Sequence, residues 1–369
     1  EAARSDIVIV QGWAMHDHPW LADLPVVLVA DLYDAIHLET LEADRDRSRT
    51  ERRHSMQVAT EVLMAQIRRG DFFLCASTRQ RDLWLGHLAA AGRLNPDTYD
   101  GDEALRGFIA EVPFGVSPTS LSTAPGAIKG VVPGIGPDDE VILWGGGIYN
   151  WFDPLTLIRA VALVHDVRPQ VRLYFLGTRH PNPAVPEMAM AASAVALAER
   201  LGLVGSVVFF NEGWVPYEHR SRWLADADIG ISCHFEHLET AYSFRTRMLD
   251  YLWAGLPIVA TDGDVFADLI RARGLGAVVA PEDVDGLTTA LIALLGDSTR
   301  LAACREQVAL LAAEMRWERL AEPLLEFCRR PRRAPDRQLP APLPPTRAAP
   351  AGRVAARLRP LAARVRRRL

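Results

Sequence analysis

Short runs of apolar, often β-branched residues alternate along the chain with longer stretches in which apolar positions recur at helical spacing. This alternation is typical of strand–helix units that build parallel sheets, so the sequence predicts an α/β fold. In the first part of the chain we expect strands at 6–10, 26–30, 72–76 and 111–113, and helices near 50–68, 79–91 and 102–110.

A stretch rich in glycine, proline, serine and threonine, residues 116–138, lacks periodicity and is predicted to be a linker. After it, residues 139–316 predict a complete domain of six strands with crossover helices, and a further helix is expected at 317–330. The expected strands are 140–144, 171–176, 206–210, 228–233, 257–261 and 276–279. The expected helices are 153–166, 187–201, 217–226, 243–254, 264–272, 283–295, 298–314 and 317–328.

The first domain, residues 1–115, is smaller than the second. Only three or four strands precede the linker, and no glycine-rich turn follows the first of them. We therefore expect this domain to be truncated at its start. Its sheet should then begin at a late strand and present an exposed apolar edge.

The C-terminal residues 331–369 form a basic tail rich in proline and arginine. Residues 331–350 hold seven prolines and predict an extended linker. In 351–369 apolar residues recur at helical spacing among arginines, at Val354, Leu358, Leu361, Val365 and Leu369. This segment is predicted to bind an anionic membrane surface, or else to be a disordered basic extension that contacts the acidic body of the protein.

Charge and composition exclude several classes of protein. The formal charge of −5 combines +10 on residues 331–369 with −15 on the rest, and an acidic body is unsuited to nucleic acid. No apolar run reaches the about 18–20 residues of a membrane-spanning helix. The four cysteines are widely separated and lack the spacing of a zinc ribbon or a disulfide scaffold, which fits a reducing cytoplasm. The single lysine, Lys129, argues against lysine Schiff-base chemistry.

The segment 139–154, DEVILWGGGIYNWFDP, runs from a predicted strand through Gly145, Gly146 and Gly147 to a helix. Consecutive glycines allow a ligand to approach the backbone closely, and the amides at a helix N-terminus favour phosphate. A tight strand-to-helix turn capped by Asp153 would leave the same pattern.

The segment 239–261, ETAYSFRTRMLDYLWAGLPIVAT, carries the densest candidate chemistry. On the expected helix 243–254, Ser243, Arg247 and Asp250 share one face. Arginine suits a phosphate oxygen and aspartate a pair of ribose hydroxyls. An ordinary ion pair on a solvated helix is the alternative.

Over roughly 139–328 the sequence resembles the retaining glycosyltransferases of group 1 (GT4-like), which have two Rossmann-like domains, the GT-B architecture. The resemblance rests on AGLPIVAT at 254–261, FLGT at 175–178, FFNEGWVP at 209–216 and LADADIGIS at 224–232. It extends more weakly to DIVIVQGW and PVVLVADLYD in the first domain. It implies a nucleotide-diphosphate sugar as donor substrate, no cofactor, no bound metal, and a last helix that crosses back to the first domain.

The chain departs from the family pattern at the donor motif. Two glutamates seven residues apart are usual, whereas here Asp250 takes the second place, Tyr242 the first, and Glu239 lies three residues earlier. The Arg and Lys that usually grip the diphosphate are missing from the glycine-rich loop. Our hypothesis is that Arg245 and Arg247 supply this charge. We therefore expect a catalytic part for Glu239 and Arg247, and donor binding by the glycines, Ser243, Arg245 and Asp250.

Other candidates follow predicted strands. One cluster, at the end of a strand of the first domain, contains Asp31, Asp34, His37 and Glu39. The resemblance implies that one of them, first Asp31, lies near the reacting carbon. The alternative is a helix that simply begins with several acidic residues. After a donor-domain strand, Arg179 or His180 could reach phosphate or sugar. The remaining candidates, expected to be structural or surface features, are Asp226/Asp228, Asp262/Asp264 and the His16–His18 trio.

The function implied is transfer of a sugar, with retention, from a nucleotide-diphosphate sugar to a saccharide or lipid-linked acceptor in surface glycan synthesis, in the cytoplasm or at the inner membrane face. One alternative is another GT-B enzyme, such as a nucleotide-sugar epimerase. A glycogen-type phosphorylase is disfavoured because it needs a cofactor lysine. The other alternative is a non-catalytic nucleotide-sugar-binding or scaffolding protein, motivated by the altered donor motif.

Overall fold

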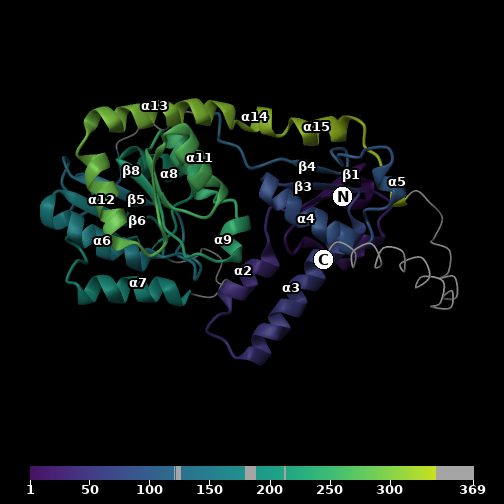
Figure 1. The fold of residues 1–369 in the computed structure, drawn as a ribbon, viewed down its shortest axis with the longest axis horizontal. Helices are drawn as coiled ribbons and strands as arrows, with labels where there is room; N and C mark the ends of the chain where they lie inside the picture. Colours follow the sequence, from purple (N-terminus) through teal and green to yellow (C-terminus); the bar gives the residue numbers. More distant parts are fainter. Residues whose placement is uncertain (120, 122–125, 179–187, 212, 338–369) are drawn as a thin grey trace, which may run out of the picture.

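The computed structural model describes residues 1–119, 121, 126–178, 188–211 and 213–337. These residues form two α/β halves side by side, joined by the linker and by helices near the end of the described chain (Figure 1). Both sheets are parallel, as the alternation of strand and helix patterns predicts.

The N-terminal half is built on a four-stranded sheet in the order β1-β2-β3-β4. Val10, Leu28 and Phe73 contribute to the hydrophobic core on one face of this sheet. The strands are β1 (Ile7–Gln11), β2 (Val27–Asp31), β3 (Phe72–Cys75) and β4 (Ile109–Glu111). The helices are α1 (Ala14–Asp17), α2 (Ile36–Ala43), α3 (Arg49–Arg69), α4 (Thr78–Ala90) and α5 (Pro96–Tyr99), with 3-10 turns at Ala2–Arg4 and Pro19–Asp23.

The strands expected at 6–10, 26–30 and 72–76 and the two longer helices of this half are confirmed. The strand expected at 111–113 lies two residues earlier, at Ile109–Glu111, and the helix expected near 102–110 is wrong. Residues 101–107 form turns, in which the Asp102 carboxylate accepts a hydrogen bond from Gly107 N at 2.6 Å. This side-chain bond competes with helix formation, and Leu105 adopts a left-handed φ of 54°. The sheet ends at β1, where Ile9 is 52% exposed.

The C-terminal half contains a six-stranded sheet in the order β10-β9-β8-β5-β6-β7. Alternate residues of β5 face opposite sides, so Ile142 joins the core under α6, α7 and α12, and Leu143 joins the core under α10, α11 and α13. The strands are β5 (Glu140–Trp144), β6 (Val171–Phe175), β7 (Val208–Phe210), β8 (Ile229–Ser232), β9 (Ile258–Thr261) and β10 (Gly276–Val279). The helices are α6 (Pro154–Val167), α7 (Ala189–Arg200), α8 (Arg220–Ala225), α9 (Leu238–Tyr242), α10 (Arg247–Ala254), α11 (Val265–Arg273), α12 (Val284–Leu295) and α13 (Ser298–Glu314), with a 3-10 turn at Tyr217–His219.

The chain order of this sheet reverses between β5 and β8, which are neighbours although far apart in sequence. In open α/β sheets, ligands bind outside the carboxyl ends of strands at such a switch point. The glycine-rich turn follows β5, and the segment that leads to α9 follows β8. The fold therefore brings together the two segments that carry most of the candidate chemistry.

The expected helix 243–254 is shorter than predicted and is preceded by a separate helix. Ser243 ends α9 with an extended backbone (ψ 153°), and α10 begins only at Arg247. Ser243 therefore does not share a helix face with Arg247 and Asp250, and that interpretation is wrong.

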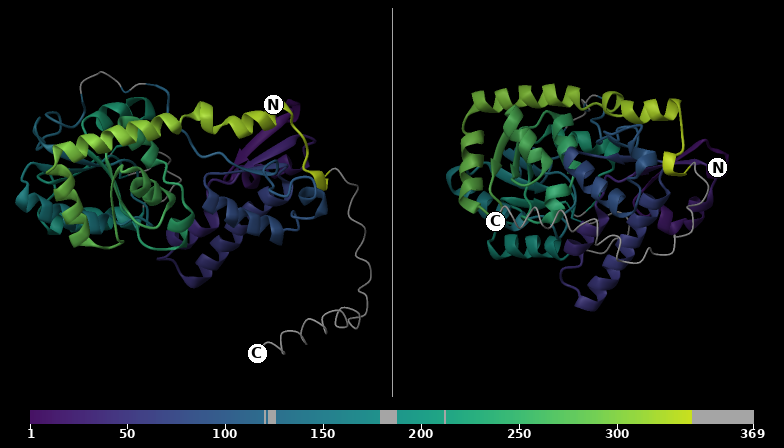
Figure 2. Two further views of the ribbon diagram at one scale, coloured as in Figure 1. Left: turned by 45° about the horizontal axis from the view of Figure 1, so that its top comes forward. Right: turned by 45° about the vertical axis from the view of Figure 1, so that its right-hand side comes forward.

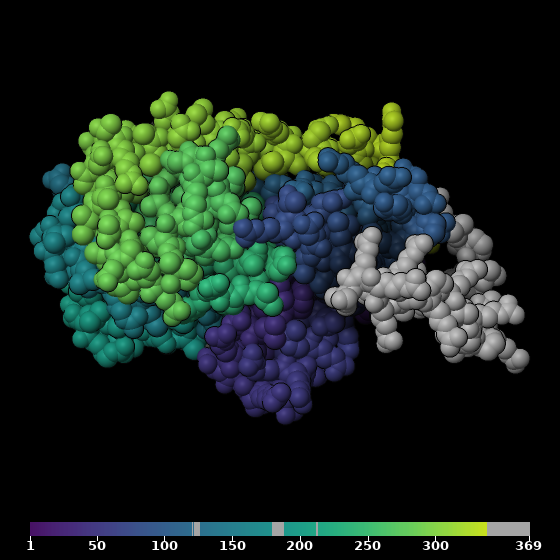
Figure 3. All heavy atoms as spheres, viewed as in Figure 1, coloured from purple at the N-terminus to yellow at the C-terminus, as the bar shows by residue number. Residues whose placement is uncertain are grey.

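The last described helices return to the N-terminal half, as the resemblance implies. After α13, the chain forms α14 (Trp317–Leu320) and α15 (Glu322–Arg329), which reaches the N-terminal half (Figure 2). Phe327 of α15 stacks on Phe72 of β3, with 4.2 Å between the ring centroids. In Figure 3 these helices form a continuous yellow-green ridge over both halves.

The tail does not separate from the body at residue 331 as expected. Ala334 is buried and donates its backbone N–H to Asp71 at 3.1 Å, and Asp336 forms an ion pair of 2.5 Å with the buried Arg93. Residues 331–337 thus belong to the N-terminal half. The apolar stripe of 351–369 lies outside the described residues.

The two connections between the halves run together. Val116 of the linker donates its N–H to Met315 O at 2.7 Å and pairs with Arg316 as an isolated parallel bridge. A Cβ on Gly115 would lie 2.6 Å from Trp317 N, so only glycine allows this close approach.

Among the described helices, none by itself is long and apolar enough to cross a membrane. Helices α12 and α13 reach the necessary length and composition only as a pair, and they meet at 94°.

Candidate functional site

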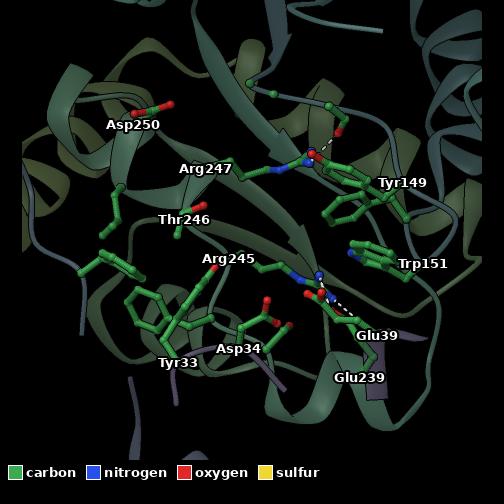
Figure 4. A pocket seen from close by; sticks show the side chains of 18 of the residues that line it. Tyr33, Asp34, Glu39, Tyr149, Trp151, Glu239, Arg245, Thr246, Arg247 and Asp250 are labelled. Atoms are coloured by element: carbon green, nitrogen blue, oxygen red, sulfur yellow. Dashed lines mark hydrogen bonds and ion pairs between the residues drawn. The ribbon is translucent and has the colours of Figure 1, made fainter. Parts of the chain in front are cut away.

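A cavity of about 940 Å³ lies between the two halves, at the carboxyl end of the switch point (Figure 4). The C-terminal half contributes the glycine-rich turn and residues around α9 and α10. The N-terminal half contributes the loop after β2 and the start of α2. Every substrate that fills the cavity will therefore touch both halves.

The glycine-rich turn offers backbone donors to this cavity. Gly146 has φ +123°, a conformation that other residues rarely adopt, and Gly145 N–H is held by the Tyr251 hydroxyl at 2.8 Å. Among the described residues, no hydrogen bond uses the N–H of Gly146 or Gly147, and both glycines are partly exposed. Two free amides at a switch point suit an anionic ligand.

The start of the following helix, in contrast, is already capped. Asp153 is 1% exposed and accepts a hydrogen bond from Thr156 N at 3.0 Å. Its carboxylate occupies the position that a phosphate would take at the N-terminus of α6. The amides of the loop are therefore available to bind phosphate, whereas those at the start of the helix are not.

Arg247 brings positive charge to the loop from the opposite side. Its Nη2 donates to Gly147 O at 2.8 Å, and its guanidinium lies 4.0 Å from the ring centre of Phe152 and 4.5 Å from that of Trp144. Its other amino nitrogen, Nη1, is buried without an acceptor among the described residues. Burial lowers the pKa of Arg247 to about 10. This arginine is thus a charged group at the loop that lacks an ionic partner of its own.

Arg245, the other arginine of the hypothesis, is neutralised by Glu239. Two parallel hydrogen bonds of 2.7 Å join the guanidinium to the Glu239 carboxylate, and both side chains are almost completely buried. The Thr240 hydroxyl lies 3.3 Å from Arg245 Nη2. A bidentate pair of this kind fixes both groups in the wall of the cavity.

A second carboxylate supports this pair from behind. Asp264 lies 3.9 Å from Arg245 Nε and 3.5 Å from His234 Nε2, and all three side chains are buried. Asp264 also caps α11 by accepting from Ala267 N at 2.8 Å. Although its burial raises the pKa, hydrogen bonding and charge from His234 and the charge of Arg245 lower it overall, so Asp264 remains ionised.

Asp250 is paired with an arginine that sequence reasoning missed. Arg220 Nη1 donates to Asp250 Oδ2 at 3.0 Å, and its guanidinium lies 5.1 Å from the ring centre of Trp214. Burial raises the pKa of Asp250, against the opposing effect of Arg220. The available signal was the position of Arg220 shortly after the FFNEGWVP segment.

The N-terminal half brings two carboxyl groups to the cavity. Asp34 and Glu39 hydrogen-bond to each other, and burial raises the pKa of each above its usual range. The hydrogen bond lowers the pKa of Asp34 and raises that of Glu39, and it requires one proton between the two carboxyl groups. Figure 4 shows this pair facing Glu239 and Arg245.

Asp31, the first choice from the sequence, does not line the cavity. It ends β2, where it accepts hydrogen bonds from Gln11 Nε2 at 3.2 Å and from Tyr33 N at 3.1 Å. Burial raises its pKa to about 6. The loop after β2 carries the backbone onward, so that Asp34 rather than Asp31 reaches the substrate space.

The remaining sequence candidates have structural partners or lie elsewhere. Asp226 and Asp228 hold the linker, through Ile128 N at 2.7 Å and Lys129 Nζ at 2.7 Å respectively. Asp262 pairs with Arg271, and the residues His16–His18 are exposed on the surface. Ser243 lines the cavity, but its hydroxyl donates to Thr240 O at 3.3 Å. Arg179 and His180 lie outside the described residues.

Among known sequences, residues 139–297 match the profile of the family described as "Glycosyl transferases group 1". The chain is similar to a D-inositol 3-phosphate glycosyltransferase of Nocardia farcinica (strain IFM 10152), with 25% identity over 318 residues, 85% of this chain and 65% of that protein. It is also similar to the probable sucrose-phosphate synthase 5 of Oryza sativa subsp. japonica, with 28% identity over 159 residues, 41% of this chain and 15% of the plant protein. The chain thus spans less than two thirds of each of these curated relatives.

Solved structures share the architecture. Anabaena HepE in complex with UDP-glucose matches with a TM-score of 0.63 and 18% identity, over 88% of this chain and 80% of HepE. A sucrose-phosphate synthase from Thermosynechococcus elongatus matches with a TM-score of 0.58 and 17% identity, over 88% of this chain and 73% of that one. The expected GT-B fold, with two Rossmann-like halves, is confirmed.

Proposed function

We propose, from the premise that residues 139–297 form a group 1 glycosyltransferase domain in a GT-B fold, that the protein transfers a sugar from a nucleotide-diphosphate sugar to an acceptor hydroxyl. One observation carries the proposal. The free amides of Gly146 and Gly147 and the unpaired charge of Arg247 meet at the switch point, inside the cavity between the halves. Together they replace the arginine and lysine that the glycine-rich loop lacks.

In this proposal the donor diphosphate lies against the loop amides and within the field of Arg247. Buried in a low-dielectric wall, that charge acts more strongly on the phosphates than an exposed one would. Asp250, on the same side of the cavity, is the carboxylate for the ribose hydroxyls; burial raises its pKa, and the ion pair with Arg220 opposes that rise. Arg245 then serves mainly to position Glu239 rather than to bind phosphate.

The reaction breaks the bond between the anomeric carbon and the diphosphate oxygen, which leaves with the electron pair. The acceptor oxygen forms the new bond, and its proton is lost to a base. Loop amides and Arg247 stabilise the charge that grows on the leaving oxygen, which is the usual way in which preorganised dipoles accelerate such a step. We propose a retaining, metal-independent reaction, in which the reacting carbon lies beside Glu239 of the C-terminal half and Asp34 of the N-terminal half, both of which line the cavity (Figure 4).

The proposed acceptor is a saccharide or a lipid-linked saccharide, used in surface glycan synthesis. The four free cysteines fit a cytoplasmic site of action. A non-catalytic nucleotide-sugar-binding protein remains the second candidate, because two of the three arginines in the described wall, Arg220 and Arg245, are already paired with carboxylates.

Donor turnover tests the proposal. Purified protein is incubated with UDP-glucose, GDP-mannose and other nucleotide sugars, with and without a mixture of saccharide acceptors, and free nucleotide and new glycoside are measured. Nucleotide release that depends on Arg247 supports an enzyme, whereas saturable binding without release supports the binding protein. Absence of both binding and release contradicts both functions.

A further inference from the structure

The wall that the N-terminal half contributes to the cavity contains no positive charge. Residues 1–115 are all described, and no lysine, arginine or histidine among them lines the cavity. Its charged groups are the carboxyls of Asp34 and Glu39. An anionic substrate would therefore meet only acids on this side.

The described cations of the opposite wall already have an ionic partner or an assigned ligand. Among the described residues lining the cavity, the cations are Arg220, Arg245 and Arg247. The first two are ion-paired, at 3.0 Å and 2.7 Å, and the proposed function assigns Arg247 to the donor diphosphate. No cation of the described wall remains for a second phosphate group.

The carboxyl pair itself disfavours an anion and favours hydroxyl groups. The hydrogen bond between Asp34 and Glu39 requires one proton, so the pair is negatively charged whenever its other proton is lost. A phosphate beside it would add charge of the same sign in a partly buried site. A sugar hydroxyl, in contrast, can donate to the Asp34 carboxylate and accept from another donor.

Aromatic rings complete this wall. Tyr33 lies next to Asp34 in the cavity and is fixed edge-on against Phe114, with 4.6 Å between the ring centroids. Trp13, which is 43% exposed, lies on the same side of the cavity. Flat apolar rings beside a few well-placed polar groups are suited to a small polar ligand with apolar C–H faces, which is the character of a sugar ring.

We propose that the acceptor unit bound by this wall is an uncharged, hydroxyl-rich sugar, and that a phosphorylated unit is rejected by the Asp34–Glu39 pair. The inference rests on the proposed function and makes it more specific. It concerns only the unit that enters the cavity, so a phosphate elsewhere on a longer acceptor is compatible with it.

Matched pairs of ligands test this selectivity. With the cavity preloaded with UDP, ligand-observed NMR compares the binding of glucose with glucose 6-phosphate, and of myo-inositol with inositol 3-phosphate, at equal ionic strength. We expect the neutral member of each pair to bind at least about tenfold more tightly, because repulsion between like charges should weaken binding of the phosphorylated member by about that factor. If phosphorylated members bind equally or better, or if no neutral sugar binds, the inference is wrong. UDP binding, measured in the same experiment, reports separately on the proposed donor site.

Charge removal tests the cause. The double variant Asp34→Asn/Glu39→Gln keeps the shape of the pair without its charge and should reduce the preference for neutral ligands at least fivefold, an order-of-magnitude expectation for the loss of one nearby charge. The control Glu103→Gln/Glu306→Gln changes two exposed acids outside the cavity and should leave the preference unchanged. If both double variants shift the preference equally, net charge rather than this wall sets it, and the inference fails. If the first variant unfolds, the comparison of matched ligands on the unaltered protein still decides.

Discussion

Two neighbouring arginines of the cavity wall should respond in opposite ways to the same substitution. Arg245 and Arg247 are both buried, but Arg245 has a bidentate carboxylate partner and Arg247 has no carboxylate partner among the described residues. Replacing each by methionine keeps the apolar stem and removes the charge. The pair of variants therefore separates a structural arginine from one that is kept for a ligand.

The expected change in the free energy of unfolding follows from the partners. Arg245→Met leaves the Glu239 carboxylate buried and unpaired, which costs about 3–5 kcal/mol. For Arg247, burial lowers the pKa to about 10, which means that keeping the guanidinium charged costs the folded protein about 3 kcal/mol. The bond to Gly147 O, worth about 1.5–3 kcal/mol, offsets most of that cost. Arg247→Met should therefore change the stability by about 1 kcal/mol or less.

For ligand binding we expect the reverse order, with a larger effect at Arg247 than at Arg245. Arg247→Met removes a charge next to the diphosphate and should raise the Kd for UDP about 10- to 100-fold, the value of one hydrogen bond to a charged group. The assays are urea unfolding followed by tryptophan fluorescence and titration calorimetry with UDP. If Arg247→Met loses several kcal/mol of stability and still binds UDP normally, Arg247 is a structural residue and the proposed donor site is wrong.

Four further outcomes are expected. Asp250→Ala should weaken UDP binding by about 1–3 kcal/mol, measured by calorimetry on a variant whose circular dichroism is unchanged; unaltered affinity would contradict its role at the ribose. Burial raises the pKa of Asp31 to about 6, so the carboxylate increasingly destabilises the folded protein as the pH rises from about 4 through 6. In urea unfolding, Asp31→Asn should therefore gain about 1–2 kcal/mol in the free energy of unfolding at pH 7 and nothing at pH 4. Asp71→Asn, at a carboxylate that binds Arg69 and Ala334 N, should cost about 3–5 kcal/mol, against less than about 1 kcal/mol for the exposed-pair control Glu314→Gln. Full-length protein should sediment with anionic but not neutral vesicles, and deletion of 338–369, which spares the docked residues before it, should abolish this; binding that survives the deletion would exclude the tail as an anchor.

Most strands could be predicted from the sequence because they are short, largely apolar runs, and those inside the sheets, such as β3, β8 and β9, are buried on both faces. The donor motif could be found for a related reason. Gly145–Gly147 and the segment before Asp250 lie directly after strands, where the topology of parallel sheets collects functional groups. These predictions depend on local pattern and chain order only.

The side-chain partners that the folded chain brings together could not be predicted in this way. The partner of Asp250 is Arg220, thirty residues earlier, and the partner of Arg245 is Glu239, across the break before α10. The apolar spacing of 244–252 continues through that break, which is why one helix was expected in place of two. Which of Asp31 and Asp34 lines the cavity depends on the direction of the loop after β2, and the sequence pattern does not specify that direction.

The paired connections at Val116 and Arg316 determine how the protein can open. Both connections between the halves lie together and are hydrogen-bonded to each other, so they act as one hinge. The halves separate by rotation about this hinge. The bonds that must break in this turn are the other cross-contacts, such as Arg79 to Asp268 at 2.5 Å and Gln80 to Tyr242 O at 2.8 Å. Substrate entry and product exit by this turn therefore break polar contacts and also the apolar packing of Tyr33 and Tyr242 against the opposite half, while Gly115 keeps the two connections close together.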